Sequence, residues 1–117
     1  LPGGRPGPKN LRACKPLCEA ASSFVASGRT VAAVCAAPSI LAELGLLEGR
    51  RATANPGFQG VLADHGATVS QDAVVEDGNL VTSQGLGTCI ELGLTLVRRI
   101  LGGDAVRACG DQIVYTR

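Results

Sequence analysis

The sequence TVAAVCAAP, residues 30–38, predicts the fold most clearly. Its apolar and β-branched run from Val31 to Val34 is typical of a buried strand in a parallel sheet. Pro38 favours the first turn of a helix, where the missing N–H of proline costs nothing. We therefore expect Cys35 on a tight strand-to-helix turn, with its sulfur near the start of a helix, where the nucleophilic thiolate is favoured.

The composition indicates one domain with a core of aliphatic side chains. The 117 residues are 45% apolar but only 3% aromatic, so the core must come from Val, Leu, Ile and Ala. The net charge of +1 is spread along the chain, which disfavours nucleic acid and anionic membrane surfaces as partners. No apolar stretch is long enough to span a bilayer. Residues 1–4 lack the pattern of a signal peptide, and we expect them to lie inside a larger protein.

The cysteine pattern favours reduced thiols in a cytoplasmic protein. There are five cysteines at irregular spacing, without a CxxC motif, and this is unlike a secreted disulfide framework. His65 is the only histidine and has no cysteine pair near it, so no metal is expected. Packing roles are favoured for Cys14, Cys18 and Cys89, and Cys109 has no evident partner.

The order of predicted elements indicates a three-layer α/β sandwich with a mostly parallel sheet. In order, we expect a Gly/Pro-rich loop (1–10), a helix (16–27), a strand (30–34), a helix (38–44), a strand (51–54), a short helix and turn (57–66), short strands (67–69, 73–76, 80–83), a long helix (87–101) and a final helix (104–111). The long helix carries an apolar stripe of Ile90, Leu94, Val97 and Leu101. A Gly-rich loop normally follows a strand, so we expect one or two βα units, each about 30 residues long, upstream.

The residues alone leave two interpretations of the Cys35 turn open. Cys35 is either a nucleophile on an elbow like that of the G-x-S-x-G motif, or an ordinary buried cysteine ending a strand. Its place at the carboxyl end of a strand, where open α/β sheets bind ligands, favours the functional interpretation. Gly4 and Ala36 are candidate backbone donors to an oxyanion, although Gly3-Gly4 also suits a plain turn. Asn55 either orients a substrate or hydrogen-bonds near the thiolate, or it simply begins a turn, and the turn is favoured.

Several motifs together resemble the ThiJ/PfpI superfamily and, within it, the Parkinson-associated DJ-one branch. They are LPGG at 1–4, VAAVCAAP at 31–38, Asn55-Pro56, EDG at 76–78, and LVTSQGLGT at 80–88 leading into IELGL. The resemblance extends from Leu1 to about Ala108. It implies that residues 1–117 are the C-terminal portion of a single flavodoxin-like α/β domain whose first βα units lie upstream, and that the protein is a homodimer.

The resemblance also implies a site. Cys35 corresponds to the reactive cysteine of the family, and Gly4 and Ala36 to the backbone donors beside it. The acid that hydrogen-bonds the cysteine precedes LPGG in the family, so no residue of this chain takes that role. Several members carry a histidine at the position of Asn55. An amide cannot act as a general base, so the resemblance assigns proton transfer to the upstream acid.

Two functions follow from the resemblance. The first is a cysteine-dependent glyoxalase or deglycase that needs no cofactor and acts on methylglyoxal-type dicarbonyls or their adducts. The second is a redox-sensing, chaperone-like stress protein without turnover, since an accessible thiolate is also readily oxidised. Some family members carry an older thiamine-biosynthesis name. A chain without the upstream acid and without activity of its own is the third possibility.

Overall fold

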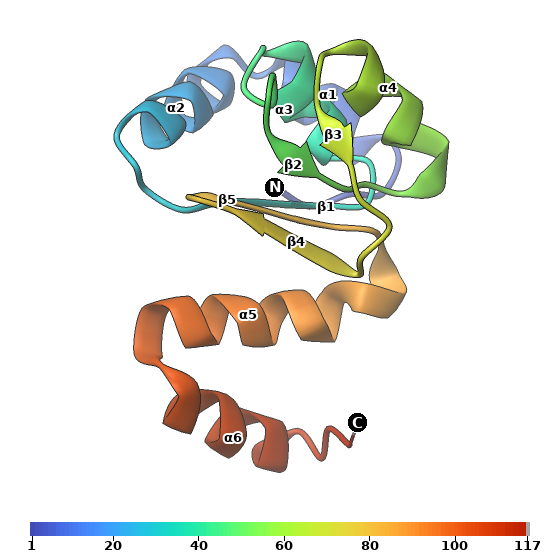
Figure 1. Cartoon of the computed structure of the whole chain (residues 1–117). Coiled ribbons are helices and arrows are strands. Elements are labelled where there is room, and N and C mark those ends of the chain that lie inside the picture. Colours follow the sequence, from blue (N-terminus) through green and yellow to red (C-terminus); the bar gives the residue numbers. More distant parts are fainter. Residues whose placement is uncertain (117) are drawn as a thin grey trace.

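The computed structural model describes residues 1–116 and places helices on both sides of a central sheet (Figure 1). The regular elements, in chain order, are α1 (Gly7–Ala13), α2 (Lys15–Ala26), β1 (Val31–Val34), α3 (Pro38–Glu43), β2 (Arg51–Ala52), the 3₁₀ helix η1 (Pro56–Phe58), α4 (Gln59–Asp64), β3 (Thr68–Val69), β4 (Val74–Asp77), β5 (Leu80–Ser83), the 3₁₀ helix η2 (Leu86–Thr88), α5 (Cys89–Leu101) and α6 (Gly103–Gln112). Within residues 1–116, no helix combines the length and apolar character needed to cross a membrane.

The central sheet has the strand order β1–β5–β4. Strands β1 and β5 are parallel, with Val31 opposite Leu80, whereas β4 and β5 form an antiparallel hairpin. Gly78 makes the hairpin turn with a φ of +58°, which suits a residue without a Cβ. Strands β2 and β3 form a second parallel pair. Every residue of β5 is buried, as expected for a strand covered on both faces.

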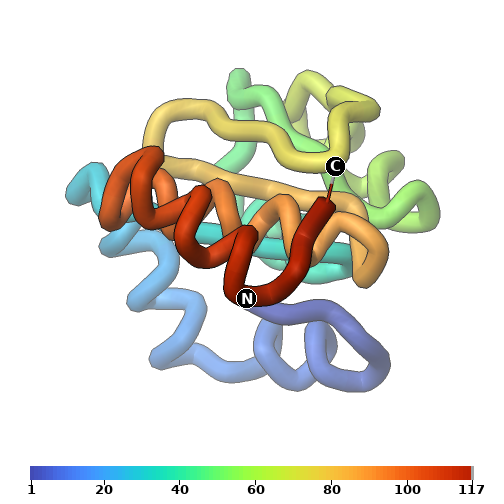
Figure 2. Tube along the Cα trace, turned by 90° about the horizontal axis from the view of Figure 1, so that it is seen from below, coloured from blue at the N-terminus to red at the C-terminus, as the bar shows by residue number. Residues whose placement is uncertain are grey.

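The helices form one layer on each face of the sheet. Helices α1 to α4, together with β2 and β3, lie on one side, and α5 and α6 lie on the other (Figure 1). The view from below shows α6 running alongside α5 as the outermost element (Figure 2). The predicted α/β sandwich with a mostly parallel sheet is therefore confirmed.

The core lies between the sheet and the helices of the first layer. Leu41 of α3, Leu47 in the turn after α3, and Leu62 of α4 have no solvent exposure, and Leu80 of β5 has 1%. Burying each such side chain contributes about 1.5–3 kcal/mol to stability, so this layer holds α3 and α4 against the sheet. The rigid base beneath the Cys35 turn is thus made of aliphatic side chains, as the composition predicts.

The predicted loop over residues 1–10 is wrong in its second half, because α1 begins at Gly7. Pro8 lies in the first helical turn, where no backbone N–H is needed. Pro16 likewise lies in the first turn of α2. Its ring would clash with the carbonyl of Arg12 in a continuous helix, so the chain breaks at Cys14, whose ψ is 97°.

The predicted apolar stripe of the long helix is also partly wrong. Ile90 and Leu101 are 50% and 71% exposed, whereas Leu92 is the buried side chain of α5. The predicted strand over 51–54 is shorter, ending at Ala52, although residues 52–54 are buried. The buried side of α5 therefore lies at Leu92, while Leu94 and Val97 of the predicted stripe are half-buried.

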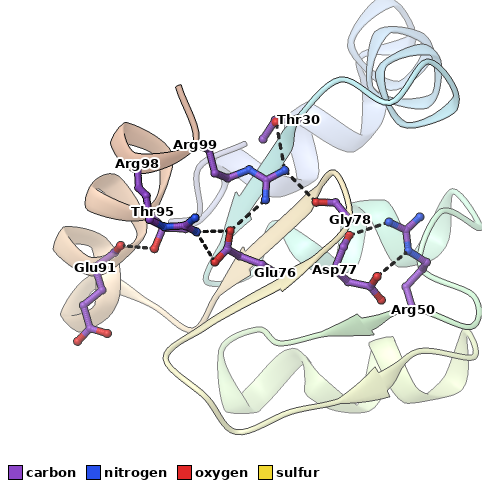
Figure 3. A network of polar contacts seen from close by, with 9 residues as sticks. All are labelled: Thr30, Arg50, Glu76, Asp77, Gly78, Glu91, Thr95, Arg98 and Arg99. Atoms are coloured by element: carbon purple, nitrogen blue, oxygen red, sulfur yellow. Dashed lines mark hydrogen bonds and ion pairs between the residues drawn. The ribbon is translucent and has the colours of Figure 1, made fainter. Parts of the chain in front are cut away.

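An arginine–carboxylate network fastens α5 to the β4–β5 hairpin (Figure 3). Glu76 of β4 accepts hydrogen bonds from Arg98 (2.6 Å to each carboxylate oxygen) and Arg99 (3.0 Å). Arg99 also donates to the carbonyl of Gly78 (2.8 Å). Partial burial raises the pKa of Glu76, but the hydrogen bonds and charges of Arg99 and Arg98 outweigh it and lower the pKa overall.

Candidate functional site

Cys35 is the residue that turns the chain from β1 into α3. Its φ is +64°, in the left-handed region that side chains other than glycine rarely adopt. The Cys35 N–H donates to the carbonyl of Ser83 (3.0 Å), and the Cys35 carbonyl accepts from the N–H of Asn55 (2.8 Å). Two neighbouring segments thus hold both backbone groups of Cys35. This over-determined, strained turn is the kind of backbone found at functional sites.

The turn continues directly into α3. The Ala37 N–H donates to the carbonyl of Val34 (3.1 Å), and the buried hydroxyl of Ser39 donates to the carbonyl of Ala36 (2.6 Å). Pro38 occupies the first turn of α3, as predicted. Cys35 as a residue is partly exposed rather than buried.

Gly3 is the closest glycine to the sulfur, and sequence reasoning missed it. A Cβ on Gly3 would lie 2.6 Å from the Cβ of Cys35 and 3.3 Å from its Sγ. Only glycine permits this approach of two backbones. The predicted donor Gly4 has a φ of +86°, and a Cβ there would meet open space. The Gly-Gly pair was the only signal in the sequence, and it did not distinguish the two positions.

The two predicted backbone donors have free N–H groups. Within residues 1–116, neither the Gly4 N–H nor the Ala36 N–H donates a hydrogen bond to the protein. Gly4 instead accepts through its carbonyl from Gly7 (2.8 Å). Free N–H groups beside a nucleophile are the arrangement required to stabilise a developing oxyanion.

The backbone of Asn55 contacts the Cys35 turn, whereas its side chain stabilises the start of the next turn. Its Oδ1 accepts from the N–H of Gly57 (3.1 Å), which makes it the N-cap of η1. Its Nδ2 lies 3.9 Å from where a Cβ on Gly85 would stand. Asn55 therefore holds the Cys35 carbonyl and starts a turn, and its amide offers no titratable group.

Hydroxyl groups brace the end of β5, behind the Cys35 turn. Ser83 Oγ donates to the carbonyl of Ala73 (2.8 Å) and lies 2.5 Å from Thr88 Oγ1. The Thr88 hydroxyl donates to the carbonyl of Gly85 and accepts from its N–H. Ser83 positions the carbonyl that holds Cys35, and no local motif predicts this role.

The other candidate residues lie in local structural roles. His65 caps the C-terminus of α4 and has Nδ1 2.9 Å from the carbonyl of Val61. Cys18 is buried and donates from Sγ to the carbonyl of Arg12, and Cys89 donates to that of Gly85. All five cysteines are free. The part of the chain that the structure describes holds no group of three or more His, Cys, Asp or Glu residues able to bind a metal.

This fold and this turn agree with the family comparison. The model of the DJ-1/PfpI family matches residues 1–99, so the chain belongs to the DJ-1/PfpI family, as its motifs predicted. Protein DJ-1 homolog A of Arabidopsis thaliana is 44% identical over 105 residues, which cover 89% of this chain and 27% of that protein. The crystal structure of Drosophila melanogaster DJ-1beta matches with a TM-score of 0.92 at 29% identity, over 98% of this chain and 62% of that one.

Relatives named as enzymes carry different activities. A deglycase of Pyrococcus abyssi is 38% identical over 84 residues, covering 72% of this chain and 50% of that protein. Isonitrile hydratase of Pseudomonas putida is 37% identical over 93 residues, covering 80% of this chain and 41% of that protein. The chain thus spans between 27% and 50% of the lengths of these curated relatives.

Proposed function

We propose that this chain provides the nucleophile of a cofactor-independent glyoxalase or deglycase. Cys35 is the nucleophile, the N–H groups of Gly4 and Ala36 stabilise the oxyanion, and the substrate is a methylglyoxal-type dicarbonyl or its adduct. The observation that carries the proposal is the left-handed Cys35 turn, which is held at both backbone groups and is flanked by two free N–H groups. The deglycase relative favours this chemistry among the activities named in the family.

The reaction needs no external oxidant. The Cys35 thiolate attacks the aldehyde carbon of methylglyoxal and forms a C–S bond, and the carbonyl electron pair moves to oxygen as an oxyanion. After protonation to the hemithioacetal, the aldehyde C–H proton moves to the neighbouring ketone carbon through an enediol. The aldehyde carbon is thereby oxidised to a thioester and the ketone carbon is reduced to an alcohol. Water then cleaves the C–S bond, giving lactate and the free thiol.

Proton transfer in this scheme requires an acid–base group other than Cys35, Gly4, Ala36 and Asn55. Asn55 cannot supply it, since an amide does not titrate in the useful range. His65 is engaged at the end of α4 by the carbonyl of Val61. We therefore propose that the upstream acid expected from the family resemblance moves the protons, and that residues 1–117 form the C-terminal portion of that single domain.

Lactate formation from methylglyoxal by the full-length protein tests the proposal. We expect turnover that disappears in Cys35→Ala and persists in Cys109→Ala, because Cys109 lies on the outermost helix α6 (Figure 2). Activity that survives Cys35→Ala would refute the assigned nucleophile. Absence of turnover in the unchanged protein would refute the enzyme function.

Redox sensing is the alternative for the same thiol, and the partial exposure of Cys35 supports it. Peptide mass spectrometry after mild peroxide treatment distinguishes this function. If the protein senses oxidants, Cys35 is the first thiol converted to sulfenic or sulfinic acid. Faster oxidation of the exposed Cys14 would count against sensing by Cys35.

We also propose a homodimer in a reducing compartment such as the cytoplasm. Large apolar side chains exposed at both ends of α5 support an interface, with Leu86 at 91%, Ile100 at 76% and Leu101 at 71% exposure. The five free cysteines support the location. Sedimentation analysis of the full-length protein should give a dimer mass, and a monomer at micromolar concentration would reject the interface.

A further inference from the structure

A pocket of about 450 Å³ opens beside the Cys35 turn, between α1 and α3. Its lining residues are Arg5, Pro6, Pro8, Lys9, Arg12, Ala36, Ser39, Ile40, Glu43 and Phe58. Ala36 directly follows Cys35, and Arg5 comes two residues after Gly3, which lies against the thiol. The pocket therefore borders the Cys35 turn through Ala36, the residue that follows the cysteine.

The pocket lining combines apolar side chains with exposed cations. Pro6, Pro8, Ile40 and Phe58 supply carbon surface for the body of a ligand. Three cations and one carboxylate line the pocket, which leaves a balance of two positive charges. The carboxylate of Glu43 is already paired with Arg12 at 3.1 Å.

The remaining two cations, Arg5 and Lys9, are free to bind a ligand. Within residues 1–116, neither side chain takes part in an ion pair or hydrogen bond. Both are exposed at the mouth of the pocket. Unpaired cations at the rim of a concave, largely apolar site attract ligands with an anionic group.

We propose that this pocket selects anionic substrates, and that its charge comes from Arg5 and Lys9. The substrate class is a dicarbonyl adduct whose body carries a carboxylate or phosphate, with the carbonyl-derived carbon at Cys35 and the anion at the rim. The pocket volume falls within the about 300–1,000 Å³ typical of small-molecule sites, which leaves room for an adduct larger than methylglyoxal. This inference rests on the proposed function for its substrate, but not for its charge selectivity.

Alkylation of Cys35 by iodoacetate and by iodoacetamide measures the selectivity without any turnover. The two reagents carry the same leaving group and differ in charge, and peptide mass spectrometry follows each cysteine of the full-length protein separately. The iodoacetate-to-iodoacetamide rate ratio at Cys35 should exceed that at Cys109 by about two- to fivefold, the range expected for exposed charges. It should fall toward the Cys109 value in high salt, because salt screens exposed charges.

Charge-matched variants assign the effect to the pocket. Lys9→Gln and Arg5→Gln should each lower the ratio at Cys35, whereas Lys15→Gln makes the same change in net charge outside the pocket and should leave it unchanged. A ratio at Cys35 equal to that at Cys109, or a ratio insensitive to Lys9→Gln and Arg5→Gln, would overturn the proposal.

Turnover assays then separate this inference from the proposed function and identify the anion. The methylglyoxal adduct of N-acetylcysteine carries a carboxylate, and the adduct of N-acetylcysteine amide is neutral. Cysteamine S-phosphate forms its adduct through the amine, and this adduct carries a phosphate. We expect a higher kcat/KM for the anionic substrates than for the amide. The anionic substrate with the higher kcat/KM shows whether the pocket prefers a carboxylate or a phosphate. Cys35-dependent turnover with no preference would refute the anionic pocket alone, whereas charge-selective alkylation without turnover would refute the enzyme function alone.

Discussion

The backbone of Gly3 lies directly against Cys35, so that a Cβ on Gly3 would stand 2.6 Å from the Cβ of Cys35. The strand-to-helix turn and the Gly-rich segment before α1 therefore form one unit. Cys35 is held in place by this close contact in addition to two backbone hydrogen bonds, from its N–H to the carbonyl of Ser83 and to its carbonyl from the N–H of Asn55. This contact makes the position of the sulfur sensitive to a single methyl group.

Gly3→Ala should move the thiol and destabilise the protein. The methyl group meets the Cβ of Cys35 and the carbonyl of Val34, so backbone must shift, and such overpacking costs about 1–3 kcal/mol. Denaturant unfolding and the alkylation rate of Cys35 both check this. Gly60→Ala is the control, since a Cβ there meets open space in α4 and should be neutral or slightly stabilising. Equal stability of the two variants would contradict the contact.

Cys35→Gly should be more stable than Cys35→Ala by about 1–2 kcal/mol. The φ of +64° strains any residue with a Cβ, and glycine removes that strain. Urea unfolding of the two variants measures the difference. The same pair at Cys109, inside α6, should show the opposite order, because glycine weakens a helix relative to alanine by about 0.5–1 kcal/mol. Equal stabilities at position 35 would show that the turn is relaxed.

Glu76→Gln should weaken the attachment of α5 at neutral pH. Because the arginines lower the folded-state pKa of Glu76, its contribution is present above its unfolded pKa of about 4.5 and is lost as the pH falls through the folded value. The effect at pH 7 should be about 1 kcal/mol or less, since the side chain is 36% exposed. Unfolding midpoints at pH 7 and near pH 3 check the sign. Glu19→Gln, on an exposed site of α2, is the control, and a difference that grows in acid would contradict the network.

Asn55→Ala should destabilise the protein by about 0.5–2 kcal/mol, because the N–H of Gly57 loses its acceptor. Asn55→Asp should retain most of the stability, since a carboxylate also caps a helix well. Thermal unfolding of both variants tests this. The Asn55 N–H that holds the Cys35 carbonyl is a backbone group and survives both changes. If Asn55→Ala abolished turnover without any loss of stability, Asn55 would act on the substrate rather than on the turn.

The fold was predictable where local pattern and tertiary structure agree. The run from Val31 to Val34 followed by Pro38 predicts strand, turn and helix, and the structure has these elements at the expected residues. Helix α1 was missed because Gly7 and Pro8 usually indicate a loop, and only the position of Pro8 in the first turn makes the helix possible. The predicted stripe on α5 was partly wrong because that helix contacts both the sheet and α6.

The site was predictable only in part, because its parts come from distant segments. Cys35 stood out from its place between strand and helix. The contacts of Gly3 and Ser83 with the turn depend on sheet order and on the path of the N-terminal segment, and no local pattern encodes them. In the sequence, Arg5 and Lys9 look like ordinary charged residues. Only the structure shows that both line the pocket.

Peptide mass spectrometry of the full-length protein, quenched during turnover of methylglyoxal, tests the central claim most directly. A nucleophilic Cys35 predicts that the peptide containing this residue carries the dicarbonyl as a thioester or hemithioacetal, while the peptide containing Cys109 stays unmodified. Lactate formation while Cys35 remains unmodified, or undiminished turnover by Cys35→Ala, would contradict it.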